Sequence, residues 1–210
     1  MLASVVFTFF YRKQSVRFHL SLLVFLMDIL VYETAVIITA FFSIHNHFIA
    51  NFNLIIYYTA MMWLLYELWK HLIGKRTRPL IIFGLSVTVF CIGWIVENLF
   101  VRELLFFNMY TPAVASFFSI LVIIYLLNQL LFVKNTSIFR DPEGLILLGL
   151  LIRNFPPCVI LIFFNFSSGY SEAFYSNILF LANLVATIST IFFLMAVLWL
   201  PERKKYTWPF

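Results

Sequence analysis

The fold class is decided by the stretch KRTRPLIIFGLSVTVFCIGWIVENLF, residues 75–100. Three bases, Lys75, Arg76 and Arg78, open it, and the run that follows from Pro79 carries a single charge, Glu97. An apolar run of about 20 residues spans the ~30 Å hydrocarbon core of a bilayer when it is helical. The run lacks the alternation of apolar and polar residues that a barrel strand needs. We therefore predict a transmembrane helix that begins beside a basic hinge.

The same unit, an apolar run bounded by short polar hinges, recurs along the chain. Six runs are long enough to span a bilayer: 18–43, 52–70, 79–100, 107–133, 144–166 and 175–200. A further run, residues 2–11, would reach only about 15 Å as a helix. No basic region precedes it, so it does not resemble a signal peptide, and we expect the true start of the chain to lie upstream of Met1.

These runs predict an all-α, polytopic transmembrane helical bundle of seven segments, the first one incomplete, in a single domain over residues 1–210. Composition supports this class, since 63% of the residues are hydrophobic, 20% are aromatic and only 11% are charged. That leaves too little polar surface to coat a soluble globule. The net charge of +5 lies in hinges beside apolar runs, so we expect no nucleic-acid partner and assign the bases to topology.

The basic residues fall on alternate hinges. Twelve of the 14 lie in the first, third and fifth hinges and the tail: Arg12, Lys13, Arg17, Lys70, Lys75, Arg76, Arg78, Lys134, Arg140, Arg203, Lys204 and Lys205. The other hinges hold only Arg102, and Arg153 is inside a run. By the positive-inside rule, the base-rich side is cytoplasmic. We predict an outside N-terminus, a cytoplasmic C-terminus and a multi-pass location in a bacterial inner membrane.

Asp28 and Arg153 are ionisable residues inside predicted spans, where charge is costly and by default marks function. Both lie roughly 14–15 Å from the cytoplasmic ends of their helices. Because a buried unpaired Arg is far costlier than one bonded to a carboxylate, we predict a buried ion pair between them. Three alternatives stay open: the pair fixes helix order, it forms a functional site, or Arg153 reaches toward lipid headgroups and no contact exists.

A second polar group gathers in the outer third of the predicted helices. It comprises Glu33, Glu97, Asn98, Asn53, Tyr57, Asn108 and Tyr110. Glu33 lies about 140° round its helix from Asp28 and roughly 7 Å farther out, so the two carboxylates cannot serve one site from one face. The group predicts an outward-facing polar pocket, with asparagines wetted at the membrane interface as the alternative.

Prolines and small residues predict local features. Pro79 and Pro142 suit the first turns of helices, and Asp141 reads as the N-cap before Pro142. The pair Pro156-Pro157 should kink or break its helix, either to shape packing or to expose backbone as transporters do.

The last helix carries a stripe of small residues, with Asn183 and Thr187 beside it. The stripe is formed by Ala182, Ala186 and Thr190. Small residues at this spacing let two helix backbones approach closely. The stripe therefore predicts a helix-contact face.

Enzyme signatures are poor. His19 and His71 lie at cytoplasmic ends, whereas His45 and His47 lie in an outer hinge. The outer pair offers only two imidazoles, fewer than the three protein ligands that catalytic zinc normally has. Cys91 and Cys158 lie within spans, where a small buried hydrophobe is expected. The chain has no Gly-rich phosphate loop, no HExxH and no GxSxG. We predict no catalytic residues, no metal and no cofactor.

Several short motifs together resemble a family of small, uncharacterised seven-helix bacterial membrane proteins. They are Leu26-Met27-Asp28-Ile29-Leu30-Val31-Tyr32, Asn53, Phe107-Asn108-Met109-Tyr110, Asp141-Pro142 with Gly149, and Asn183. The resemblance covers nearly the whole chain and implies seven helices, an outside N-terminus and no assigned activity. The chain departs from the family at residues 56–60 and 111–115, which lack charge, and at Arg153 and the double proline, which look added.

The function expected from these features is a non-enzymatic, sensor-like or partner-binding membrane module with its ligand side outside. The partners would be the lipid bilayer and a protein partner or further copies of the chain. The alternative is a small permease with a central Asp28/Arg153 site, and the third hypothesis is an intramembrane enzyme. A permease should show a continuous polar face toward the midplane, whereas polarity here is concentrated near the outer ends.

Overall fold

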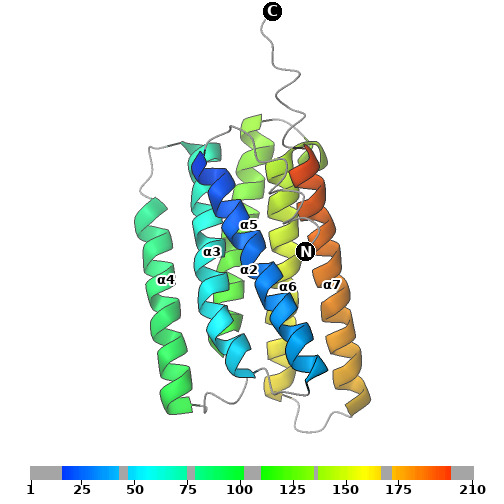
Figure 1. The fold of residues 1–210 in the computed structure, drawn as a ribbon. Coiled ribbons are helices and arrows are strands. Elements are labelled where there is room, and N and C mark those ends of the chain that lie inside the picture. Colours follow the sequence, from blue (N-terminus) through cyan, green and yellow to red (C-terminus); the bar gives the residue numbers. More distant parts are fainter. Residues whose placement is uncertain are drawn as a thin grey trace, which may run out of the picture. The chain divides into compact units, whose positions relative to one another are not determined.

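A computed structural model describes residues 16–42, 47–74, 79–101, 110–134, 137–166 and 172–199. These residues form six long helices, whose order along the chain can be followed in Figure 1. They are α2 (Val16–Phe41), α3 (His47–Ile73), α4 (Pro79–Val96), α5 (Tyr110–Lys134), α6 (Pro142–Phe166) and α7 (Glu172–Trp199). Two short turns complete the described chain: the π-helical η1 (Glu97–Val101) and the 3-10 helix η2 (Ile138–Arg140).

The described parts of the six long predicted runs are helical, as expected, and the predicted segment 2–11 lies outside the described residues. Five helices contain a stretch long and apolar enough to cross a membrane: Phe18–Thr39, Ile49–Ile73, Pro79–Phe100, Tyr110–Phe132 and Phe180–Leu198. The protein is thus all-helical, with five membrane-span-capable helices among its described residues.

The described helices group into two compact units whose boundary falls within α5, between Ala115 and Ser116. The first unit holds α2, α3, α4, η1 and the first turns of α5. The second holds the rest of α5 with η2, α6 and α7. The prediction of a single domain stays a prediction.

Aromatic contacts join α3 to α4 along the length of the first unit. Phe52 meets Trp94 edge-on at 5.3 Å between ring centroids, and Tyr58 stacks on Phe90 at 4.3 Å. Phe83 forms T-shaped pairs with both Tyr66 and Trp69, each at 6.0 Å between ring centroids. The hydroxyls of Tyr58 and Ser86 lie 2.7 Å apart and share a hydrogen bond. These contacts join the two helices through both ring packing and a hydrogen bond.

The second unit is built on the packing of α6 against α7. Gly149 of α6 faces the fully buried ring of Phe193, and its carbonyl accepts a 2.8 Å hydrogen bond from Ser189 Oγ. The buried face of α7 is therefore formed by Ser189, Phe193, Ala196 and Val197. The predicted contact face lies partly beside this one: its members Ala182, Ala186 and Thr190 are half-buried, and the neighbouring Asn183 and Thr187 are exposed.

The two predicted helix starts are confirmed, and one predicted helix break is not. α4 begins at Pro79 and α6 at Pro142, and Asp141 Oδ1 accepts the N–H of Glu143 as the predicted N-cap. The predicted break at Pro156-Pro157 is wrong, because α6 runs without interruption to Phe166, and a kink there stays a prediction. A proline removes a backbone donor but keeps φ near −65°, a helical value, so the hydrogen bonds on either side can carry the helix onward.

The Gly149 contact gives a testable prediction. A Cβ at this position would lie 2.8 Å from Cε1 of Phe193, closer than real Cβ contacts, and the buried ring has little room to move. Gly149→Ala should therefore lower the free energy of unfolding by about 1–3 kcal/mol, measured by thermal unfolding in detergent. The control is Gly84→Ala in α4, where nothing lies within 4 Å, so stability should hold or rise by up to about 1 kcal/mol. Equal effects of the two variants would contradict the packing argument.

Candidate functional site

Glu97 is the best-defined polar residue of the predicted outer group. It is the first residue of η1 and is only 3% exposed. Its Oε1 accepts the backbone N–H of Tyr110 at 3.0 Å, and its Oε2 accepts that of Thr111 at 2.8 Å. Tyr110 and Thr111 are the first two residues of α5, and the first turn of α5 has no acidic residue of its own. Glu97 thus caps α5 from the end of another helix.

The capping contact has a clear electrostatic basis. The first N–H groups of a helix have no partner within the helix, and the aligned peptide dipoles add about half a positive charge there. A carboxylate that accepts two of these N–H groups provides their hydrogen-bond partner and also places a negative charge at the positive end of the helix dipole. The close approach of Gly93 supports the arrangement, because a Cβ there would lie 3.4 Å from the side chain of Thr111. The end of α4 and the start of α5 are therefore joined by both packing and charge.

Asn98 and Trp94 extend this polar end of the first unit. Asn98, which is 7% exposed, donates from Nδ2 to the Trp94 carbonyl at 2.7 Å. Its Oδ1 is buried and has no hydrogen-bond partner among the described residues. The indole N–H of Trp94 donates to the backbone carbonyl of Asn51 at 2.9 Å, which ties α4 to α3 at the same end. We call Trp94, Glu97, Asn98 and Tyr110 the outer cluster.

The other members of the predicted pocket lie on α2 and α3 or outside the described residues. Glu33 is on the exposed surface of α2. Asn53 and Tyr57 are half-buried on α3, where Tyr57 packs against Phe25 of α2 at 5.5 Å. Asn108 lies outside the described residues. The structure therefore joins Glu97 to the first residue of α5, with Asn98 beside it in η1, and a pocket shared with Glu33 stays a prediction.

Asp28 and Arg153 belong to different units. Asp28 lies near the middle of α2 and is 9% exposed. Arg153 is half-buried on α6, with its Nη1 atom fully enclosed. Both side chains are thus at least partly withdrawn from the surface, as an internal site would require. Their contact stays a prediction.

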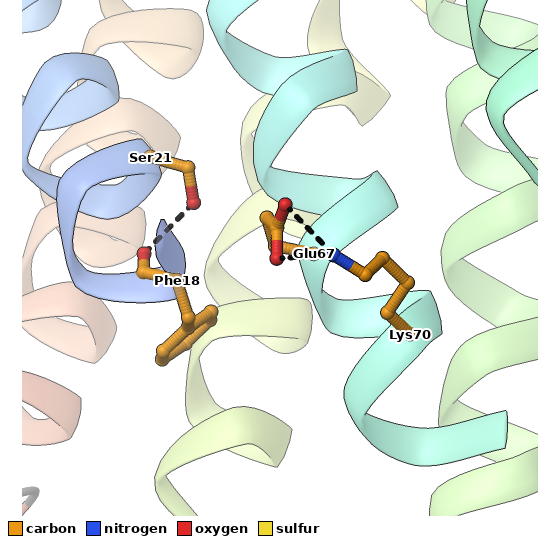
Figure 2. Close-up of polar contacts among 4 residues, drawn as sticks. All are labelled: Phe18, Ser21, Glu67 and Lys70. Atoms are coloured by element: carbon orange, nitrogen blue, oxygen red, sulfur yellow. Dashed lines mark hydrogen bonds and ion pairs between the residues drawn. The ribbon is translucent and has the colours of Figure 1, made fainter. Parts of the chain in front are cut away.

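Sequence reasoning missed a charged pair at the opposite end of the first unit. Lys70 Nζ lies 3.2 Å from Oε2 of Glu67, one turn away on α3, and 5.0 Å from the centre of the Tyr66 ring. Glu67 is only 7% exposed. Figure 2 shows this pair on α3 beside Phe18 and Ser21 of α2, where the buried Ser21 hydroxyl donates to the Phe18 carbonyl at 2.8 Å. The signal was available, since Glu and Lys three residues apart on a helix are neighbours.

Histidines and cysteines give no metal site in the part of the chain that the structure describes. There, no group of three or more His, Cys, Asp or Glu side chains could hold a metal ion. His45 lies outside that part. His71 stacks on Phe18 at 6.4 Å between ring centroids, and Cys91 and Cys158 form no disulfide with any described residue.

Comparison with protein-family models, curated proteins and solved structures finds no match for this chain. The fold defines it as an all-helical protein with membrane-span-capable helices. The resemblance to seven-helix bacterial membrane proteins stays a prediction.

The capping role of Glu97 can be tested by removing its charge. Glu97→Gln keeps the side-chain length, but one acceptor becomes an NH2 group that faces a backbone N–H of α5. We expect a loss of about 1–2 kcal/mol in the free energy of unfolding, measured by thermal unfolding in detergent. Glu33→Gln, at an exposed position of α2, is the matched control and should change stability by less than about 0.5 kcal/mol. A Glu97→Gln protein as stable as the control would refute the capping role.

Proposed function

We propose that the protein is an integral membrane bundle of seven helices in a bacterial inner membrane, with an outside N-terminus and a cytoplasmic C-terminus. In this proposal it is a non-enzymatic, sensor-like or partner-binding module, and α6 crosses the membrane with the five span-capable helices. The alternation of basic hinges supports the orientation. It puts the outer cluster at the external face and the Glu67–Lys70 pair at the cytoplasmic face.

The observation that carries the sensor-like role is the contact of Glu97 with the first turn of α5. This helix belongs to the first unit through Ala115 and to the second unit from Ser116 onward. A ligand or partner that engages Glu97 or the enclosed Asn98 oxygen would alter how the first unit holds α5. Because a helix is stiff along its length, the change would reach the second unit. The outer cluster would then be the input and α5 the connecting element.

A small permease is the second candidate, and the burial of Asp28 favours it. A carboxylate withdrawn from the surface near the middle of a membrane helix is costly and commonly serves a substrate or ion pathway. In that case Asp28 and Arg153 would form the central site.

The orientation can be checked by labelling single cysteines in a Cys91→Ser, Cys158→Ser background with a membrane-impermeant maleimide. Tyr110 is 48% exposed at the start of α5, and Ser137 is exposed in the hinge before α6. We expect Tyr110→Cys to react in intact cells and Ser137→Cys to react only after permeabilisation. The opposite pattern would invert the proposed topology, and equal labelling of both would argue against insertion.

The sensor-like role is tested with a fluorophore at Ser137→Cys, at the far end of α5 from the outer cluster. If α5 connects the two ends, Glu97→Gln should shift the emission or quenching of this label in membranes. Glu33→Gln serves as the matched control and should leave the signal unchanged. If neither substitution changes the emission or quenching of the label, and the variants are folded and inserted, transmission through α5 is refuted. A flux of solute into proteoliposomes that Asp28→Asn abolishes would instead favour the permease.

A further inference from the structure

The side-chain oxygen of Asn98 is a buried acceptor that the described residues leave unused. Asn98 is 7% exposed, and its Nδ2 group already donates to the Trp94 carbonyl at 2.7 Å. Its Oδ1 atom is enclosed and has no hydrogen-bond partner among the described residues. A buried acceptor without a partner is costly, so such an atom usually bonds to a water, an ion or a ligand.

The place of Asn98 in the fold favours a positively charged partner. The π-helical turn η1 follows α4 directly, so Asn98 lies in the last turn of this helix. The last carbonyl groups of a helix have no N–H partner within it, and the peptide dipoles place about half a negative charge there. The last turn of η1 contains no basic residue. The helix end therefore combines the amide oxygen of Asn98 with carbonyl oxygens in a region of negative potential.

The carboxylate of Glu97 adds to this negative potential. It is 3% exposed, and its two oxygens accept the backbone N–H groups of Tyr110 and Thr111. The start of α5 carries only about half a positive charge, so it offsets only part of the carboxylate. With the negative end of η1 included, about one negative elementary charge remains where α4 meets α5. A monovalent cation would balance this charge, whereas a divalent cation would leave a buried positive charge uncompensated.

We propose that the outer cluster binds a small monovalent metal cation, such as sodium, through Asn98 Oδ1 beside Glu97. Carbonyl groups at helix ends are known to coordinate sodium inside membrane proteins. The described residues hold no group of three or more His, Cys, Asp or Glu side chains for a metal ion, so the other ligands would be carbonyl oxygens. The inference rests on the proposed function, because it names the external ligand of the same cluster. An ion beside Glu97 would alter how this carboxylate holds α5.

The test uses the purified full-length protein in detergent, with sodium chloride exchanged for N-methylglucamine chloride at constant ionic strength. N-methylglucamine is too large to reach an enclosed oxygen, so the difference in melting temperature between the two salts measures binding of sodium. We expect sodium to raise the melting temperature by at least about 3 °C, because a ligand that binds only the folded state stabilises it. Asn98→Leu removes the oxygen at similar volume and should reduce this shift to less than about 1 °C.

Two variants serve as controls. Asn53→Leu makes the same change at a half-buried position of α3 in the same unit and should keep the full sodium shift. Asn98→Asp keeps an oxygen and adds a charge, so it should lower the sodium concentration at half-maximal shift at least about threefold. Because each shift compares two salts within one variant, a less stable variant does not imitate a loss of binding. Binding of radiolabelled sodium to the purified variants should follow the same order.

Four results would overturn the cation site: no sodium shift in the unsubstituted protein, an equal shift in Asn98→Leu, a shift that Asn53→Leu also abolishes, or a larger shift with magnesium than with sodium. Arg102, the next basic residue along the chain, lies outside the described residues, so Arg102→Gln is measured too. A sodium shift that appears only in Arg102→Gln would mean that the guanidinium group takes the place of the ion, which also overturns the proposal.

The melting experiment does not depend on topology, so failure of the cation site and failure of the proposed function can be told apart. A sodium shift together with inverted maleimide labelling of Tyr110→Cys and Ser137→Cys rejects the proposed function and keeps the cation site. Correct labelling and transmission through α5 without a sodium shift reject the cation site alone.

Discussion

The first N–H groups of α5 are the constraint on which the outer end of the first unit depends. These N–H groups have no hydrogen-bond acceptor within α5, and the first turn supplies no acidic side chain. The structure meets the need with the carboxylate of Glu97, held at the start of a π-helical turn that ends α4. A π-turn widens the helix locally and is commonly found at functional sites. Here it coincides with the residue that bridges two helices.

A second constraint governs how the helices hold together. If lipid surrounds the protein, apolar area alone gives no preference for helix over lipid, so specific contacts must decide. Between α3 and α4 these contacts are ring against ring, with a shared hydroxyl hydrogen bond at mid-length and the indole of Trp94 on a carbonyl of α3 at one end. Between α6 and α7 they are different, because a glycine admits a buried phenylalanine ring and a serine bonds its carbonyl. The α3–α4 pair and the α6–α7 pair are therefore held together by different kinds of contact.

The sequence predicted what depends on local pattern. Apolar run length located the helices, and the Asp141-Pro142 pair located the start of α6 with its N-cap. Glu97 was assigned to the outer polar group, but its partners are 13 and 14 residues away across a hinge, and no periodicity relates them. The contact partners of α7 were not predicted, because small residues show where close approach is allowed, whereas the contact of Phe193 with Gly149 depends on the rotation of both helices. Glu67 was overlooked beside the bases from which the orientation was predicted, although its spacing from Lys70 was visible in the sequence.

Because the carboxylate that caps α5 lies at the end of α4, the stability of α5 depends on how and when the two helices assemble. A helix that carries its own cap can form as soon as its residues leave the ribosome and reach the bilayer. The start of α5 depends on a second helix instead, since its N–H groups bond to a carboxylate in the turn that ends α4. In the proposed topology, α4 and α5 form a hairpin that is complete only when both have crossed. The membrane insertion machinery would then have to insert these two helices as a pair. The contact of Glu97 with α5 would set the order in which the first unit is assembled.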